Sequence, residues 1–277
     1  MKKVALALGG GGARGLAHLK VLDFFTRENI PISRISGASI GAIIGALYAS
    51  GKSPKGIQED LDRYTVINDD RKRDMLKKIP DLMVRLGMVK FDWKRTGVVR
   101  TEKFLEFLLS DLDVENFEDL DIPLTLSATD FWNGEEVILH SGPLMPAIMA
   151  SMAIPGVFPP VEHQGRVLVD GSLANSVPYS HHLDEDDISV AIDVAPDRAP
   201  GKHRVPKLME ASMGMFDMLI DKLAHHQRDH IQPDIYLRPG ILGVGIFDFE
   251  KIDSVYEQAD AVLPELTKQL AAHGIEI

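Results

Sequence analysis

A serine in a glycine-flanked turn is the first candidate for chemistry in this sequence. Residues 37–41 read Gly-Ala-Ser-Ile-Gly and match the pattern G-x-S-x-G around Ser39. In enzymes with this pattern the serine lies in a strained turn between a strand and a helix, where its hydroxyl can attack a carbonyl carbon. Gly37 and Gly41 leave room for the crossing backbone, and a helical pattern begins near Ile40. Ser39 is therefore the predicted nucleophile.

A second glycine-rich turn, residues 9–15, follows the first apolar run of the chain. Gly10, Gly12 and Gly15 fit the dinucleotide-binding pattern G-x-G-x-x-G. That use requires an acidic residue about twenty positions further on to bind the ribose. No Asp or Glu occurs between Asn29 and Gln58, so the acidic residue that a dinucleotide-binding site requires is missing.

Consecutive glycines still predict a site where the backbone closely approaches a bound group. Successive N–H groups at the start of a helix converge on an anion. Without a phosphate partner, that anion can be the transient oxyanion of acyl transfer. Arg14 either orients this loop and adds positive potential, or forms a salt bridge that ties the helix start to a neighbour.

A serine nucleophile needs a base, and the sequence offers two kinds. None of the ten histidines follows a predicted strand in an obvious catalytic loop, and His203 is the nearest candidate. Asp170, by contrast, ends the apolar run 166–169 and is followed by Gly171, which places a carboxylate at the edge of the predicted sheet. The alternative role of Asp170 is to form an ordinary Asp-Gly turn.

Short apolar runs alternate with helical patterns along the chain. This alternation predicts a mostly parallel sheet covered on both faces, in a single α/β domain. Asn133-Gly134 predicts a hairpin and thus one antiparallel pair. One terminal helix is expected over 252–272, with a kink at Pro264. The predicted strands are Lys3–Leu8, Ile32–Ser36, Leu124–Thr129, Val137–His140, Arg166–Val169, Ser189–Val194 and Ile235–Leu237.

Composition excludes several classes of function. The 277 residues include no cysteine, which removes thiol nucleophiles, thiolate metal sites and disulfides and fits a reducing compartment. A net charge of −11 argues against non-specific binding of nucleic acid. No apolar run is long enough to span a bilayer, and the run Val4–Leu8 is too short for a secretion signal. We therefore expect a cytoplasmic protein.

Residues 71–95 depart from this acidic character. They hold nine Lys or Arg and three Asp, a net charge of +6, interleaved with apolar side chains that include Trp93. A basic amphipathic segment of this kind can lie on an anionic membrane surface or cover an active site. It can also be an insertion whose apolar side packs on the core.

The motifs together resemble those of the patatin-like phospholipase family, whose members hydrolyse lipid acyl esters with a Ser-Asp dyad. The resemblance covers about Val4–Ser50 and Leu124–Tyr179, with a weaker echo at Pro233–Pro239. The matching stretches are Gly10-Gly11-Gly12-Ala13-Arg14-Gly15, Gly37-Ala38-Ser39-Ile40-Gly41, Ala128-Thr129-Asp130, Ser141-Gly142-Pro143, Ile154-Pro155-Gly156-Val157-Phe158-Pro159-Pro160 and Asp170-Gly171.

The resemblance implies a three-layer sandwich and a role for each matching residue. Ser39 would be the nucleophile, Asp170 its direct base, and Gly10, Gly11 and Gly12 the oxyanion loop. The supporting motif residues would be Arg14, Gly15, Gly37, Ile40, Gly41 and Gly171. The chain departs from the family's Asp-Gly-Gly or Asp-Gly-Ala at Ser172, which is next to the turn that would position Asp170.

The implied enzyme acts on a phospholipid, a lysophospholipid or a simple fatty-acyl ester, and needs neither metal nor cofactor. Residues 4–183 would form the catalytic core, with 71–95 as a variable insertion and a possible contact with membranes. Residues 184–277 would add strands and helices to the same domain.

Two other functions remain open. The chain can be a lipid- or protein-binding regulatory module that keeps the same fold without catalysis. His226 and His230, four residues apart on a predicted helix, can also be metal ligands. Because no third ligand is clearly placed, exposed surface histidines are the simpler interpretation.

Overall fold

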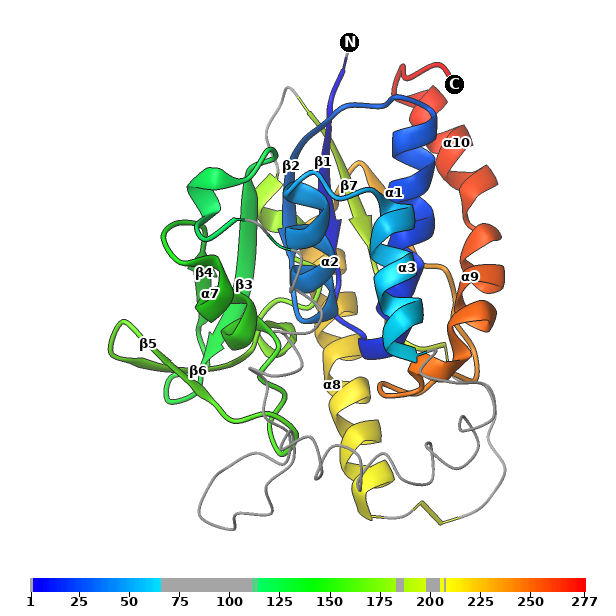
Figure 1. Cartoon of the computed structure of the whole chain (residues 1–277). Helices are drawn as coiled ribbons and strands as arrows, with labels where there is room; N and C mark the ends of the chain where they lie inside the picture. Colours follow the sequence, from blue (N-terminus) through cyan, green and yellow to red (C-terminus); the bar gives the residue numbers. More distant parts are fainter. Residues whose placement is uncertain (1, 66–111, 113, 183–186, 198–204, 207) are drawn as a thin grey trace.

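The computed structural model describes residues 2–65, 112, 114–182, 187–197, 205–206 and 208–277 (Figure 1). The basic segment 71–95 and His203 lie outside these residues. Within the described part, no helix is both long and apolar enough to cross a lipid bilayer.

The centre of the fold is an eight-stranded sheet in the order β5-β6-β3-β2-β1-β7-β8, with β4 paired to β3. Five strands, β1, β2, β3, β7 and β8, run parallel, whereas β4 and β6 are antiparallel to β3, and β5 to β6. The strands are β1 Val4–Leu8, β2 Ile32–Gly37, β3 Leu124–Asp130, β4 Glu136–Leu139, β5 Val161–His163, β6 Arg166–Asp170, β7 Ile188–Ile192 and β8 Ile235–Leu237.

These strands confirm the predicted mostly parallel sheet. Each predicted strand is present with ends that differ by at most two residues, and the Asn133-Gly134 turn joins β3 to β4 as a hairpin. The sequence did not predict β5, which has three residues and exposes Glu162. Strand β7 pairs with β1, and β8 pairs with β7. Strands from residues 4–183 and from residues 184–277 therefore belong to one sheet.

Strands β2 and β6 meet end to end along one edge of β3. Leu126 of β3 pairs with Gly37 of β2 on one side and with Leu139 of β4 on the other. Two residues further, Ala128 pairs with Asp170 of β6 and again with β4. Because β4 occupies one edge of β3, β2 and β6 share the opposite edge. Their directions are opposed, so their carboxyl ends approach each other there.

Helices cover one face of the sheet over the main hydrophobic core. Val4, Leu6 and Leu8 of β1 are fully buried on this face. Figure 1 shows α1, α3, α9 and α10 grouped on one side of the view. The α-helices are α1 Ala17–Arg27, α2 Ile40–Ala49, α3 Pro54–Thr65, α7 Leu144–Ser151, α8 Leu208–His230, α9 Ile252–Asp260 and α10 Leu263–Ala272.

The opposite face carries a smaller cluster, in which Ala7 of β1 packs with Tyr179. Tyr179 belongs to the short 3-10 segment η5 (Tyr179–His182), and its hydroxyl donates to the Ile231 carbonyl just after α8, at 2.8 Å. On α8 itself, the Arg228 guanidinium lies 4.5 Å from the ring centroid of Tyr236. Both faces are therefore covered, as the predicted three-layer sandwich requires.

The single terminal helix predicted over 252–272 is wrong in one respect, because two helices occupy it. Helix α9 ends at Asp260 and α10 begins at Leu263, with Pro264 in its first turn. A proline inside a helix lacks the N–H group and clashes with the carbonyl four residues earlier, here that of Asp260, whereas the first turn tolerates it. The predicted apolar face remains, since Val255 and Leu266 are fully buried.

Candidate active site

Ser39 occupies the turn between β2 and α2, as the sequence predicted. Its backbone has φ 53° and ψ −121°, a left-handed conformation that is strained for any residue except glycine. Its N–H donates to Oγ of the buried Ser151, at the end of α7, at 3.1 Å. The flanking glycines are needed for space: a Cβ on Gly41 would lie 2.1 Å from the carbonyl oxygen of Leu8, and one on Gly37 2.6 Å from that of Gly41.

Asp170, the last residue of β6, lies beside Ser39 and is completely buried. Its Oδ1 accepts the Ser172 N–H at 2.8 Å. The Ser39 hydroxyl is within hydrogen-bonding reach of the carboxylate. The contact between Ser39 and Asp170 falls short of full hydrogen-bond geometry. Among the described residues, no donor forms a hydrogen bond of full geometry with Asp170 Oδ2.

The environment of Asp170 makes it a stronger base than an ordinary aspartate. Burial raises the pKa of Asp170 from its usual 3.8 to about 6, although the Ser172 N–H bond and the nearby hydroxyls of Ser39 and Ser172 partly offset the rise. The turn-forming role is present as well, because Oδ1 caps the 3-10 segment η4 (Gly171–Leu173). Gly171 allows this turn, since a Cβ there would lie 1.9 Å from the carbonyl oxygen of Ser127.

The glycine loop lies next to Ser39, but its three predicted amides are not equivalent. The Gly10 N–H donates to the Ser176 carbonyl at 2.9 Å, so this amide is already engaged. The N–H groups of Gly11 and Gly12 have no acceptor in the part of the chain that the structure describes. Gly12 has φ +59°, which favours glycine. The loop is fixed to α2, because Gly15 packs against Ile40 so closely that a Cβ would lie 2.2 Å from its side chain.

Arg14 forms the salt bridge that the sequence left as an alternative. Its side chain is 1% exposed and binds Asp217 of α8 in a bidentate pair, at 2.5 and 3.4 Å. The guanidinium also donates to the carbonyls of Val194 and Val244, at 3.3 and 3.0 Å. Arg14 therefore connects the end of the glycine loop to a helix that lies 203 residues further along the chain.

Helix α8 closes the space beside Ser39. The cavity at Ser39 has a volume of about 10 Å³, which is room for roughly one water molecule. It is lined by Gly11, Gly12, Ser39, Ile154, Ser172, Ile246 and three residues of α8, Phe216, Asp217 and Ile220. An acyl chain cannot enter a space of this size, so this conformation of the site is closed.

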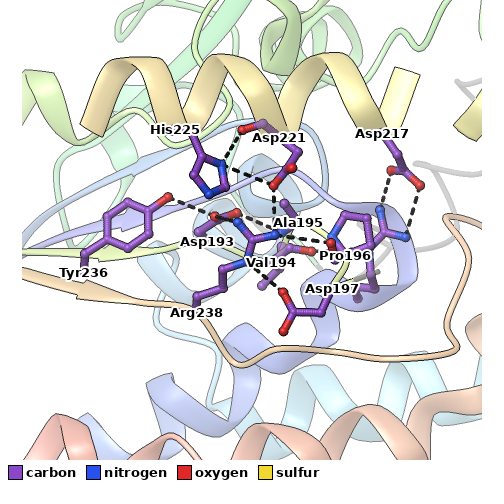
Figure 2. A network of polar contacts seen from close by, with 11 residues as sticks. Asp193, Val194, Ala195, Pro196, Asp197, Asp217, Asp221, His225, Tyr236 and Arg238 are labelled. Carbon is purple, nitrogen blue, oxygen red and sulfur yellow. Dashed lines mark hydrogen bonds and ion pairs between the residues drawn. The ribbon is translucent and has the colours of Figure 1, made fainter. Parts of the chain in front are cut away.

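A second arginine holds α8 one turn beyond Asp217 (Figure 2). Arg238, just after β8, binds Asp221 of α8 at 2.8 Å, Asp193 at 3.1 Å and Asp197 at 3.2 Å. Asp193 follows β7 and also accepts the hydroxyl of Tyr236 at 2.9 Å. None of the sequence motifs predicted this network. A charged residue directly after each of two buried parallel strands was the available signal, since such positions meet at one edge of the sheet.

None of the described histidines lines the cavity at Ser39. His18 of α1 is fully buried beside the glycine loop, where its Nε2 lies 2.8 Å from the Gly9 carbonyl oxygen. Burial lowers the pKa of His18 to about 4, so it stays neutral and supports the loop. His226 and His230 lie on α8 as predicted, with exposed rings 4.3 Å apart. Within the described residues, no three His, Cys, Asp or Glu side chains are grouped for a metal ion.

Comparisons with known proteins place these motifs in a family. A family model described as patatin-like phospholipase matches residues 6–181. An uncharacterized NTE family protein of Mycobacterium tuberculosis is 34% identical over 178 residues, which are 64% of this chain and 45% of that protein. Lysophospholipase NTE1 of Scheffersomyces stipitis is 27% identical over 278 residues, which are 91% of this chain and 17% of that protein.

The chain thus spans less than half the length of these curated relatives. Among solved structures, VipD from Legionella pneumophila is similar with a TM-score of 0.49 and 15% identity, over 95% of this chain and 67% of that one. The family model covers more than half of the chain and includes the glycine loop, Ser39 and Asp170. The chain therefore belongs to the patatin-like phospholipase family.

Proposed function

We propose that this protein hydrolyses carboxylic esters of lipids, with Ser39 as nucleophile and Asp170 as its base. One observation carries the proposal: a serine in a strained turn lies within hydrogen-bonding reach of a fully buried carboxylate with a raised pKa. Family membership and the relative named as a lysophospholipase support the substrate class. Phospholipids, lysophospholipids and simple fatty-acyl esters all fit this class.

In the first half of the reaction, Ser39 Oγ attacks the ester carbonyl carbon and its proton passes to Asp170. With a pKa of about 6, about nine-tenths of Asp170 is ionised at pH 7 and ready to accept that proton. The carbonyl oxygen becomes an oxyanion, which the free N–H groups of Gly11 and Gly12 can stabilise. The alcohol then leaves with the proton from Asp170, and the acyl group stays on Ser39.

In the second half, a water molecule attacks the acyl carbon while Asp170 accepts its proton. Collapse of the second tetrahedral intermediate releases the fatty acid, and Ser39 regains a proton from Asp170. A single carboxylate thus serves as base and acid in turn. The raised pKa of Asp170 suits proton acceptance and proton donation better than the pKa of an ordinary aspartate would.

Substrate entry requires α8 to move from the closed position. The other walls are formed by the glycine loop, the turn at Ser39 and η4, which directly follow β1, β2 and β6, together with Ile154 after α7 and Ile246 after β8. Helix α8 instead contacts the site through Phe216, Asp217 and Ile220 and is held by ion pairs to Arg14 and Arg238.

We also propose a peripheral contact with anionic membranes through residues 71–95, in a protein of the cytoplasm. The net charge of +6 and the interleaved apolar residues support it. Sedimentation with vesicles of neutral and anionic phospholipid tests the contact. Changing Lys72, Arg73, Lys77 and Lys78 to Gln should reduce binding to anionic vesicles only. Equal binding of the wild-type and the substituted protein to anionic vesicles would contradict the proposal.

The decisive experiment is hydrolysis of a panel of p-nitrophenyl esters, lysophospholipids and phospholipids by wild type, Ser39→Ala and Ser254→Ala. Loss of the nucleophile should lower kcat by at least ~10³-fold. The control removes an exposed hydroxyl on α9 and should leave kcat unchanged. A fluorophosphonate probe should label wild type but not Ser39→Ala. Liposome binding without labelling or turnover would favour the regulatory module instead.

A further inference from the structure

Ser172 carries a buried hydroxyl that the proposed mechanism leaves unused. The residue is 1% exposed, and its Oγ has no hydrogen-bond partner among the described residues. Folded proteins contain few such groups, because removing a hydroxyl from water without a new partner is unfavourable. An unpaired hydroxyl beside a reactive group therefore points to a partner that arrives with the substrate.

The Ser172 hydroxyl lies close to both the glycine loop and Ser39. Ser172 lines the same 10 Å³ cavity as Ser39, Gly11 and Gly12. A Cβ built on Gly10 would lie 2.0 Å from Ser172 Oγ and 3.3 Å from Ser39 Cβ. The hydroxyl and the nucleophile are thus on the same side of Gly10, and only a glycine at position 10 leaves space for both.

The hydrogen bonds of the loop leave a place for this donor. Of the three amides predicted to form the oxyanion site, that of Gly10 is bonded to the Ser176 carbonyl, and those of Gly11 and Gly12 remain free. We propose that the Ser172 hydroxyl is the third donor to the oxyanion, in the place that the Gly10 amide cannot fill. The inference rests on the proposed function and adds a catalytic residue to it.

The role of Ser172 is confined to the charged intermediate. When Ser39 Oγ bonds to the carbonyl carbon, the electron pair of the C=O bond moves to oxygen and the Ser39 proton moves to Asp170. The new oxyanion then accepts hydrogen bonds from Gly11 N–H, Gly12 N–H and Ser172 Oγ–H. Ser172 loses no proton and forms no covalent bond. Its contribution should appear in kcat rather than in KM.

A competing role for the hydroxyl is to bind Asp170. The Ser172 N–H already donates to Asp170 Oδ1, and the Ser172 side chain is near enough to help lower the pKa of that carboxyl. The two roles predict different measurements. A donor to the oxyanion affects binding of tetrahedral adducts, whereas a donor to Asp170 affects the acid limb of the pH profile.

The test compares Ser172→Ala with Ser176→Ala, a matched removal of a buried hydroxyl four residues away and outside the cavity. We expect Ser172→Ala to lower kcat on a p-nitrophenyl ester by about 10²-fold with KM nearly unchanged, as for other oxyanion donors. A trifluoromethyl ketone forms a charged tetrahedral adduct with a serine nucleophile. Its Ki should rise by the same factor in Ser172→Ala and remain at the wild-type value in Ser176→Ala.

Each other outcome overturns the inference. An unchanged Ki with an acid limb moved to higher pH would assign the hydroxyl to Asp170. Equal losses in Ser172→Ala and Ser176→Ala would indicate a structural effect. Ser39→Ala separates this inference from the function: if Ser39→Ala is inactive while Ser172→Ala matches wild type, only the role of Ser172 is wrong. If Ser39→Ala is active, the proposed function itself fails.

Discussion

Asp170→Asn should abolish ester hydrolysis and yet stabilise the folded protein at neutral pH. Asparagine has the same shape, and its Oδ1 can still accept the Ser172 N–H. It cannot take a proton from Ser39, so kcat should fall by at least ~10³-fold, as for loss of a triad member. It also removes a charge that the folded protein holds in a fully buried position.

The gain in stability follows from the pKa of Asp170, which is about 6 in the folded protein and 3.8 when unfolded. Above pH 3.8 the unfolded chain binds fewer protons than the folded one, so this group lowers stability as pH rises and its effect is complete above pH 6. The cost is about 1.5 kcal/mol at pH 5 and about 3 kcal/mol at pH 8. Asp170→Asn recovers it, with a rise in Tm on the order of 5–10 °C at pH 8.

Urea unfolding of wild type, Asp170→Asn and Asp229→Asn at pH 5 and pH 8 measures this difference. Asp229 is exposed near the end of α8, so its substitution should change stability by no more than about 0.5 kcal/mol at either pH. A loss of stability in Asp170→Asn, or a gain that does not grow with pH, would show that burial does not raise the pKa of Asp170.

Three further predictions concern the groups around the nucleophile. Because Asp170 must be ionised, kcat/KM should fall about tenfold from pH 7 to pH 5, and a profile flat across this range would contradict its role. Asp217→Asn removes the ion pair that holds α8 to the glycine loop in this closed position, so hydrolysis of a soluble short-chain ester should rise several-fold while Tm falls. Slower hydrolysis would mean that the contact with Arg14 is needed for activity. Ser151→Ala removes the acceptor of the Ser39 N–H and should lower kcat about tenfold in stopped assays; unchanged kcat would show that α2 holds the turn alone.

The nucleophile turn could be predicted because its requirements are local. A strand, a sharp turn and a helix occur within about twenty residues, and the glycines that relieve the crowding around Ser39 are visible in the pattern itself. The end of β6 at Asp170 is equally local. The parallel strands follow from the alternation of apolar runs and helices.

The meeting of Ser39 and Asp170 could not be derived from these patterns. It depends on β6 running antiparallel to β3 along the edge that β2 leaves free beyond Gly37. An apolar run of five residues carries no information on the direction or partner of its strand. The family resemblance, not the periodicity, paired the two residues.

Contacts between segments that are distant in the chain could not be predicted from the sequence either. Arg14 and Asp217 are 203 residues apart, and the sequence allowed a salt bridge for Arg14 without identifying the partner. The departure at Ser172 was visible, but its burial and missing partner are properties of the packed site. The prediction of one helix over 252–272, kinked at Pro264, is wrong because the apolar face persists across a break in the backbone between two helices.

The proposed use of an aspartate as direct base would link activity to stability in this fold. A Ser-His-Asp triad uses a histidine whose ordinary pKa already lies near 6.5, and the described histidine nearest the loop, His18, is held neutral against Gly9. An aspartate reaches the same range only through burial, which costs the folded protein the roughly 3 kcal/mol that Asp170→Asn recovers. Any variant that admits water to Asp170 should therefore lower its pKa, raise stability at pH 8 and reduce kcat/KM together. Variants in which stability and kcat/KM rise together would show that the basicity of Asp170 does not limit the reaction.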